Sequence, residues 1–161
     1  VVEKADLRHA SSLCKAVDVV ACEQRFLPLF QPDSLDCAKK FIQESVEKNY
    51  PLYYALKEDE IVAWCDIIPK PYEEMKHVGT LFFGMIANYR GNGIGSELMK
   101  KALAHAKTNN KIERVELEVF ESNRYGMELC KSLGFSVEGK KLKARKIGKH
   151  YDNVIVMGKL I

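Results

Sequence analysis

The sequence lacks the patterns that mark membrane, secreted and metal-binding proteins. In 161 residues no uninterrupted apolar run approaches the ~18 residues that a membrane helix needs, and residues 61–65 are typical of the longest. The first residues contain no basic region followed by an apolar one, so we expect neither a secretory signal nor a membrane partner. The five cysteines form no C-x-x-C pair and the four histidines no H-x-x-x-H pair, which argues against a disulfide framework and a zinc site. We therefore expect no metal and a reducing, cytoplasmic compartment.

An excess of charge of one sign is also missing from most of the chain. Lys and Arg number 25 against 22 Asp and Glu, which leaves +3. A nucleic-acid-binding domain usually has a pI above about 9, so we expect no nucleic-acid partner. Six cations and no acid lie in residues 140–149, which we call the basic segment. Subtracting these six from +3 leaves −3 for the rest of the chain, so the excess is local.

The hydrophobic pattern predicts one α/β domain that spans residues 1–161. A chain of this length buries about 68–70% of the surface that it exposes when unfolded, so its core needs no disulfide or metal. Helical and strand-like patterns follow in the order β-α-α-β-β-β-α-β-α-β-β, which indicates a mixed sheet. Asp6 is the expected start of the first helix, and Asp33 or Ser34 that of the second. We expect strands near residues 1–4, 51–56, 61–68, 76–86, 112–120, 135–142 and 151–160, and helices near 6–24, 34–48, 94–106 and 123–133.

The most informative segment is residues 90–96, R-G-N-G-I-G-S, which we call the glycine turn. Its three glycines allow backbone conformations that are closed to other residues and let a ligand approach the main chain. Their amides, with those of the helix that follows, indicate an anion site for which a diphosphate is the natural ligand. A simple change of chain direction is the alternative. Walker A and Rossmann patterns fit weakly, because no Gly-Lys-Ser/Thr is present and Ser96 stands where the Rossmann pattern has its third glycine.

Two motifs carry a resemblance to a known family. Arg90-x-x-Gly93-x-Gly95 resembles the acyl-CoA signature Q/R-x-x-G-x-G/A of the GNAT acetyltransferase superfamily. Downstream, Asn123 and the stretch 129–135 resemble its N-x-x-A-x-x-L-Y-x-x-x-G-F segment. The similarity is specific over about residues 79–139. It implies the GNAT fold, a mixed and mostly antiparallel sheet that is splayed at strands 4 and 5 and flanked by about four helices.

The resemblance implies an enzyme that transfers the acetyl group of acetyl-CoA to a primary amine. The backbone amides of residues 91–96 would hold the pyrophosphate, and the main chain around Phe83 and Met85 would pair with the pantetheine like an added strand. Asn123 would bond the pantetheine arm, and it is equally suited to capping the helix that it begins. The predicted cofactor-binding residues are Phe83, Met85, Arg90, Gly91, Asn92, Gly93, Ile94, Gly95, Ser96 and Asn123.

Two catalytic residues follow from the same resemblance. Glu118 is similar in position to the general base of some members, which would remove a proton from the acceptor ammonium. Glu118 is also an ordinary polar residue of a half-exposed strand, as Glu116 is; His77 and Glu23 are the reserve candidates. Cys130 stands where the family commonly has a tyrosine that protonates the departing thiolate. The alternative is that Cys130 is only a small buried residue, in which case water or Tyr125 would protonate the thiolate.

Several functions remain open from the sequence. The acceptor is expected to be a small primary amine, such as an amino acid, with a protein N-terminus or lysine as the alternative. The cysteine at position 130 also fits a catalytically inactive CoA-binding regulatory module, and the glycine turn fits a nucleotide-binding protein. The acceptor pocket is expected to be built by the first two helices and the hairpin, with residues 23–26, Trp64 and Tyr72 as candidates. Dimerisation is common among similar proteins, so a homodimer is compatible with the resemblance.

The basic segment has three interpretations. It is expected to be a solvated loop between the last two strands, as most runs of charge are. The alternatives are a contact to the outlying phosphate of CoA and an attraction for an acidic substrate or partner. Nucleic acid fits poorly, because no aromatic residues alternate with the cations to stack on bases.

Overall fold

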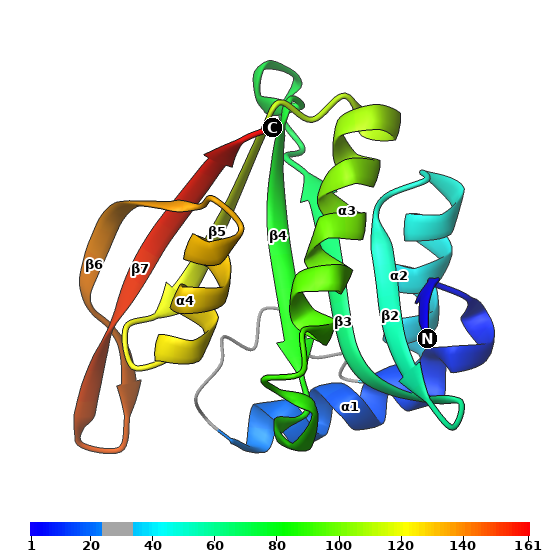
Figure 1. The fold of residues 1–161 in the computed structure, drawn as a ribbon, viewed down its shortest axis with the longest axis horizontal. Helices are drawn as coiled ribbons and strands as arrows, with labels where there is room; N and C mark the ends of the chain where they lie inside the picture. Colours follow the sequence, from blue (N-terminus) through cyan, green and yellow to red (C-terminus); the bar gives the residue numbers. More distant parts are fainter. Residues whose placement is uncertain (24–33) are drawn as a thin grey trace.

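The structure is a computed structural model that describes residues 1–23 and 34–161. Its strands form one seven-stranded sheet with helices on both faces (Figure 1). The predicted order of elements is confirmed, with short 3-10 turns added at residues 7–9, 73–75 and 87–89. In chain order the elements are β1 (Val2–Lys4), α1 (Ala10–Cys22), α2 (Leu35–Glu47), β2 (Leu52–Lys57), β3 (Glu60–Pro69), β4 (Val78–Met85), α3 (Ile94–Asn110), β5 (Arg114–Phe120), α4 (Arg124–Ser132), β6 (Ser136–Ile147) and β7 (His150–Leu160).

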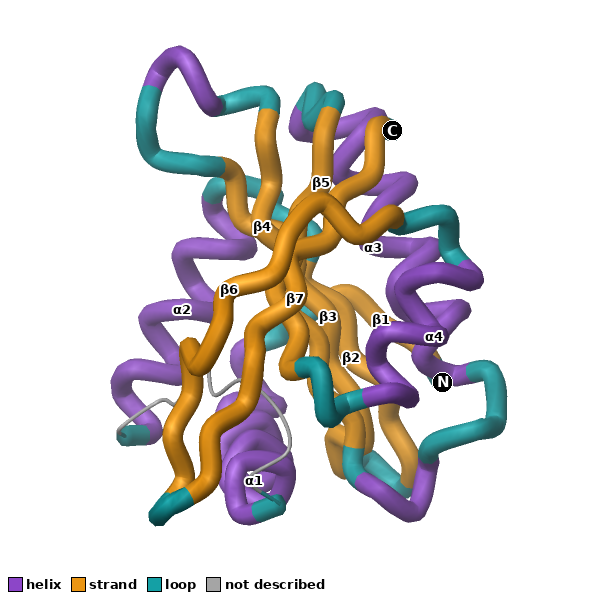
Figure 2. Tube along the Cα trace, turned by 90° about the vertical axis from the view of Figure 1, so that its left-hand side faces the viewer, coloured by secondary structure: helices purple, strands orange, loops and turns teal. Residues whose placement is uncertain are grey.

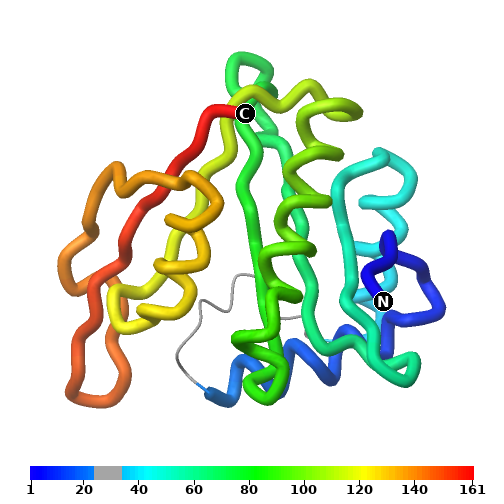
Figure 3. Tube along the Cα trace, viewed as in Figure 1, coloured from blue at the N-terminus to red at the C-terminus, as the bar shows by residue number. Residues whose placement is uncertain are grey.

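The sheet has the strand order β1-β2-β3-β4-β5-β7-β6. All neighbours are antiparallel except β4 and β5, which are parallel. These two strands pair over only three positions, the last being Thr80 with Glu116. Beyond these positions β4 and β5 diverge, as Figure 3 also shows. The splayed, mostly antiparallel sheet expected from the resemblance is therefore confirmed.

Two apolar clusters hold the helices to opposite faces of the sheet (Figure 2). One cluster joins α3 and α4 to the sheet, with Leu98 and Met157 almost fully buried. The other joins α1 and α2 to β2 and β3, with Leu13 and Ile42 at its centre. Residues paired across neighbouring strands point to the same face. We call the face that carries α1 and α2 the α1 face.

The start of the first helix differs from the prediction. The Asp6 side chain accepts a hydrogen bond from the backbone N–H of Arg8, and this cap begins a 3-10 turn rather than an α-helix. The regular helix starts at Ala10. Ser34 caps α2 by accepting from the N–H of Cys37, as one of the two expected starts. The predicted end of the first helix at Gln24 and the other expected start, Asp33, lie outside the described residues.

The basic segment is not the loop that was expected. Most of it belongs to β6, which runs to Ile147 and returns directly into β7. Between Lys141 and Arg145 the register of β6 against β7 shifts, and within this stretch the backbone N–H of Lys143 donates to the side-chain oxygen of Asn153. Pairing along a long hairpin thus keeps these cations on a strand.

Candidate active site

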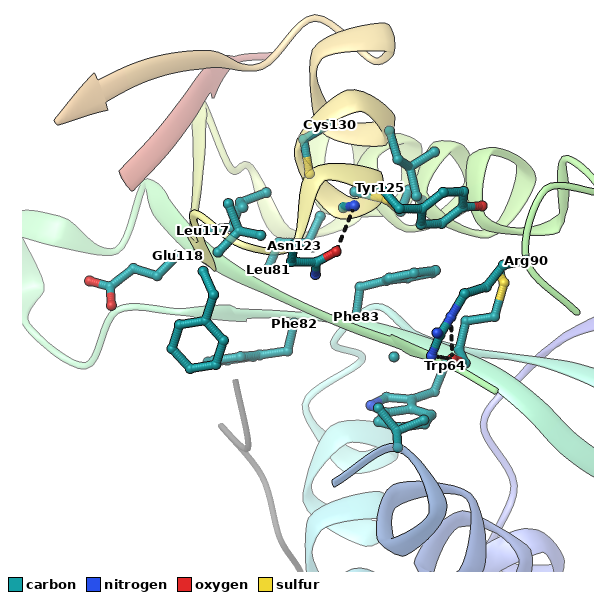
Figure 4. A pocket seen from close by; sticks show the side chains of 18 of the residues that line it. Trp64, Leu81, Phe82, Phe83, Arg90, Leu117, Glu118, Asn123, Tyr125 and Cys130 are labelled. Carbon is teal, nitrogen blue, oxygen red and sulfur yellow. Dashed lines mark hydrogen bonds between the residues drawn. The ribbon is translucent and has the colours of Figure 1, made fainter. Parts of the chain in front are cut away.

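The divergence of β4 and β5 opens a pocket between them, which we call the interstrand pocket (Figure 4). Its walls come from the second half of β4, from Leu117–Phe120 of β5, from the start of α4 and from one side of α1. In Figure 4 Asn123, Tyr125 and Cys130 lie above β4, and Trp64 lies below it. The pocket therefore reaches both faces of the sheet through the gap between the strands.

The three glycines of the glycine turn serve two physical purposes. Gly91 and Gly93 have φ angles of +83° and +79°, and a Cβ at either position would meet no atom within 4 Å. These two are needed for backbone conformation, which other residues adopt only at a cost. A Cβ on Gly95 would lie only 3.1 Å from the side chains of Leu129 and Phe83. Gly95 therefore lets the start of α3 pack closely against α4 and β4.

A group of backbone amides is concentrated at this turn. The N–H groups of residues 92–96 have no acceptor among the residues that the structure describes. They surround the N-terminus of α3, where the helix dipole adds positive potential. The N–H of Gly91 donates to the hydroxyl of Tyr125 at 3.0 Å. Such a set of amides fits an anion with several oxygens, such as a pyrophosphate.

Arg90 connects the glycine turn to two other elements. Its guanidinium donates to both carboxylate oxygens of Glu23, each at 2.8 Å, and to the backbone oxygen of Met85 at 2.7 Å. The pair is three-quarters buried or more, with 19% of the Arg90 side chain and 24% of that of Glu23 exposed. Arg90 lines the pocket, but these contacts tie its charge to the end of α1 and of β4. Glu23, a reserve candidate for the base, is thus a partner of Arg90.

The exposed edge of β4 forms one side of the opening. Phe83 and Met85 lie beyond Thr80, where β4 pairs with β3 but no longer with β5. Gly84 lies between them, and a Cβ there would come within 2.2 Å of the Trp64 indole. The indole therefore covers this glycine on the α1 face. The main chain on the open edge of β4 can accept an extended ligand as an added strand.

Asn123 lines the pocket and caps α4 at the same time. Its side-chain oxygen accepts from the N–H of Gly126 at 2.9 Å. The family motif has alanine where this chain has Gly126, and a Cβ there would lie 2.7 Å from the Asn123 amide nitrogen. The capping role of Asn123 is confirmed, and its bond to pantetheine stays a prediction.

Comparison with protein families agrees with this geometry. Residues 19–135, which are 117 of the 161, match the model of the acetyltransferase (GNAT) family. The chain belongs to the GNAT acetyltransferase family. Its members are acetyl-CoA-dependent acetyltransferases, so this chain is a transferase. The amides of the glycine turn and the open edge of β4 fit acetyl-CoA, the donor of the acetyl group.

Solved structures show the same fold. A GNAT acetyltransferase from Streptococcus pneumoniae is 24% identical with a TM-score of 0.91, covering 100% of this chain and 99% of that one. The ribosomal-protein-alanine N-acetyltransferase of Brucella melitensis is 19% identical with a TM-score of 0.87, over 100% and 99%. A putative acetyltransferase from Salmonella typhimurium, determined with its cofactor acetyl-CoA, is 12% identical with a TM-score of 0.88, over 99% and 92%.

Glu118 lies at the rim of the acetyltransferase's pocket, with 37% of its side chain exposed. The ammonium of Lys141 contacts its carboxylate, which Figure 4 shows directed away from Asn123. Glu116 is two residues earlier on the same face and pairs with Lys70 at 2.6 Å, an interaction that lowers the pKa of its carboxyl. The structure therefore separates the two glutamates, since Glu116 does not line the pocket.

Cys130 lies on α4 with its sulfur directed toward the pocket in Figure 4. Only 6% of the residue is exposed, and burial raises the pKa of its thiol to about 12. The thiol therefore keeps its proton at neutral pH. The position of Cys130 in the pocket is compatible with a role at the departing thiolate, and its burial is compatible with a small packing residue. Its role at the thiolate stays a prediction.

The structure shows which of the remaining candidate residues line the pocket. Trp64 lines the pocket, whereas Tyr72 is exposed outside it. His77 is also exposed, at the end of β4 that pairs with β5. Residues 24–26 lie outside the described residues. Phe82 and Phe120 line the pocket but were not among the residues predicted from the sequence. The alternation of strand residues places both on the face of Glu118.

Residues 1–23 and 34–161 contain no group of three His, Cys, Asp or Glu that could hold a metal ion. Within the same ranges, no helix has both the length and the apolar character needed to cross a bilayer.

Proposed function

We propose that residues 1–161 form a single N-acetyltransferase domain whose acceptor is a small primary amine. The observation that carries the dependence on acetyl-CoA is the group of amides of residues 92–96, which donate to none of the described residues and lie beside the interstrand pocket. The near-complete match to the length of other family structures supports one domain. Five free thiols and the need for acetyl-CoA support the cytoplasm as its compartment.

The glycine turn and β4 would position acetyl-CoA. The amides of residues 92–96 would donate to the pyrophosphate, and the Gly91 amide would exchange the Tyr125 hydroxyl for a phosphate oxygen. The open edge of β4 near Phe83 and Met85 would pair with the pantetheine, and Asn123 would donate to it. Held this way, the thioester lies between the α4 side and the α1 face, where an amine can reach it.

Glu118 would act on the acceptor from the α1 face. An amine with a pKa near ~10 enters as an ammonium and must lose a proton before it can attack the thioester. Glu118 already holds one ammonium, that of Lys141. The acceptor ammonium would replace Lys141 at this carboxylate and release its proton to Glu118, directly or through water. The neutral amine then attacks the thioester carbon, and the C–S bond breaks to release CoA as the thiolate. The new amide nitrogen gives its second proton to water, which supplies one to the thiolate.

Cys130 would assist the departure of that thiolate. Its thiol is protonated at neutral pH because burial raises its pKa to about 12. A group of this kind donates a hydrogen bond to the sulfur anion more readily than it gives up the proton. Water from the open side of the pocket would then complete the protonation.

A protein N-terminus is the second candidate acceptor. It is supported by the similarity in fold to the ribosomal-protein-alanine N-acetyltransferase of Brucella melitensis. A peptide would enter from the same α1 face, so the chemistry at Glu118 would be unchanged.

The test is release of free CoA thiol from acetyl-CoA with a panel of amines, amino acids and short peptides. Glu118→Gln is expected to abolish most turnover while leaving CoA binding intact. Glu116→Gln is the matched control, because Glu116 has the same chemistry on the same strand face but lies outside the pocket. Binding of acetyl-CoA without turnover of any acceptor would overturn the enzymatic proposal and favour an inactive CoA-binding module.

A further inference from the structure

We propose that Lys141 is a self-acetylation site, to which the enzyme transfers an acetyl group from acetyl-CoA bound in its own pocket. This inference rests on the proposed function, because it uses the same pocket and the same base. It adds a modification site to the protein and assigns a role to one cation of the basic segment.

Strand pairing brings Lys141 to the face of the sheet where the acceptor enters. β7 lies between β5 and β6 (Figure 1). Glu118 of β5 pairs with Val156 of β7, which in turn pairs with Gly139 of β6. Residues in one such row share a face, and so do residues two positions apart on a strand. Lys141 follows Gly139 by two positions, so it lies on the α1 face with Glu118 and its long side chain reaches across β7.

The ammonium of Lys141 contacts the carboxylate of the proposed base, Glu118. Among the described residues that line the interstrand pocket, only Glu118 carries a carboxylate. Other lysines also contact carboxylates, as Lys140 does with Glu121, but Glu121 does not line the pocket. Since the acceptor amine must reach Glu118 to lose its proton, Lys141 already occupies the place of the acceptor.

The chemistry of Lys141 suits this place. Its ammonium is a primary amine, which is the chemical class proposed for the acceptor, on a flexible four-carbon stem. The side chains of Lys141 and Glu118 are 54% and 37% exposed. An ion pair as exposed as this one contributes little to stability, so the amine can leave the carboxylate and turn toward the pocket. An amine tethered to the site also has a high effective concentration there.

The transfer follows the steps that a free acceptor would take. The Lys141 ammonium gives one proton to Glu118, and the neutral Nζ attacks the thioester carbon. A C–N bond forms, the C–S bond breaks, and its electron pair leaves on the sulfur of the CoA thiolate. The amide nitrogen gives its second proton to water, which supplies one to the thiolate, and Glu118 returns its proton to the solvent. The product is an uncharged amide, so Lys141 reacts once and its ion pair with Glu118 is lost.

The neighbouring lysine is a matched internal control. Lys140 has a similarly exposed side chain, 45% against 54% for Lys141, and its ammonium also contacts a carboxylate, that of Glu121. The alternation of β6 turns Lys140 to the opposite face of the sheet from Lys141. Chemical acetylation of exposed lysines would therefore modify both residues, whereas catalysis in the pocket would modify Lys141 alone.

The experiment incubates the unaltered protein, Glu118→Gln and Glu121→Gln with acetyl-CoA and no other acceptor. Fragmentation mass spectrometry measures the rate of acetylation at Lys141 and at Lys140. A general base contributes about 10²- to 10⁴-fold to the rate, so Glu118→Gln should slow the reaction at Lys141 about 100-fold or more. Glu121→Gln should leave the rate at Lys141 unchanged. Acetyl-CoA binding by each variant verifies that its fold is intact.

The kinetic order of the reaction is a second measurement. Lys141 and Glu118 are in contact within one chain, so the rate per molecule should not depend on the protein concentration. A rate per molecule that rises with protein concentration would show transfer between molecules and overturn the inference. Equal rates at Lys140 and Lys141, or an unchanged rate at Lys141 in Glu118→Gln, would overturn it as well.

The outcomes separate this inference from the proposed function. An enzyme that acetylates external amines but leaves its own Lys141 unmodified would overturn the inference and uphold the proposed function. Acetylation of Lys141 without turnover of any external amine would uphold the inference and overturn the small-amine acceptor. If acetyl-CoA binds and neither Lys141 nor any external acceptor is acetylated, both are wrong.

Discussion

Gly93 provides a direct test of the glycine turn. It lies immediately before α3 with a φ angle of +79°, and a Cβ there would meet nothing within 4 Å. Gly93→Ala therefore adds no collision and changes only the cost of the backbone conformation. That cost is about 1–2 kcal/mol for a residue with a Cβ in the left-handed region.

The structure indicates when this cost is paid. The amides of residues 92–96 make no hydrogen bond to the described residues, so none of these five amides holds the turn in its conformation before acetyl-CoA binds. The variant turn can relax when empty and must return to the left-handed conformation to bind the pyrophosphate. Since 1.4 kcal/mol corresponds to a factor of ten, the Kd for CoA should rise about 5- to 30-fold. Titration calorimetry with CoA measures this directly.

Gly148 is the matched control for this substitution. Its φ angle is +57°, and a Cβ there also meets nothing within 4 Å, but it lies in the turn of the β6–β7 hairpin. Strand pairing holds that turn in the empty protein, so Gly148→Ala should lower the melting temperature and leave the Kd for CoA unchanged. The reasoning is refuted if Gly93→Ala binds CoA as tightly as the unaltered protein, or if both variants weaken CoA binding equally.

Three further predictions concern buried and paired groups. Asp66 is 4% exposed, its carboxyl group makes no hydrogen bond or ion pair to the described residues, and burial raises the pKa of this carboxyl well above the usual range. The folded state therefore binds this proton more tightly than the unfolded state, so the free energy of unfolding falls as the pH rises from about 4. Asp66→Asn should remove this loss, which denaturant unfolding at pH 5 and pH 8 measures. The idea is contradicted if the variant is no more stable than the unaltered protein at pH 8. Cys130→Ala should lower kcat about tenfold through a lost hydrogen bond with KM for acetyl-CoA unchanged, and an unaltered kcat would leave Cys130 as packing only. Glu23→Gln should reduce both thermal stability and CoA affinity because it breaks the two-bond pair with Arg90, and unchanged affinity in calorimetry would show that this pair does not support the glycine turn.

Features that depend on neighbouring residues could be predicted from the sequence. The conformation of the glycine turn follows from the freedom of Gly91 and Gly93, and the cap at Asn123 follows from its own side chain and the N–H three residues later. The order of helices and strands follows from hydrophobic spacing in the same way. Each of these features depends on interactions between residues that lie only a few positions apart in the sequence.

Features that depend on strand register could not. The contact between Lys141 and Glu118, and the stacking of Arg145 on Phe120, join residues that are more than 20 positions apart and meet only because β7 pairs with both β5 and β6. A bulge in β6 shifts this register, and no pattern in the sequence marked it. The basic segment was consequently predicted as a loop, although pairing with β7 makes most of it a strand.

The short pairing between β4 and β5 has a consequence for the lifetime of the protein. Among the described residues, β4 and β5 pair at only three positions, and acetyl-CoA bound in the opening would link these two strands a second time. A ligand present at one hundred times its Kd adds about 2.7 kcal/mol to the free energy of unfolding. Resistance of the protein to proteolysis should therefore rise with the concentration of acetyl-CoA.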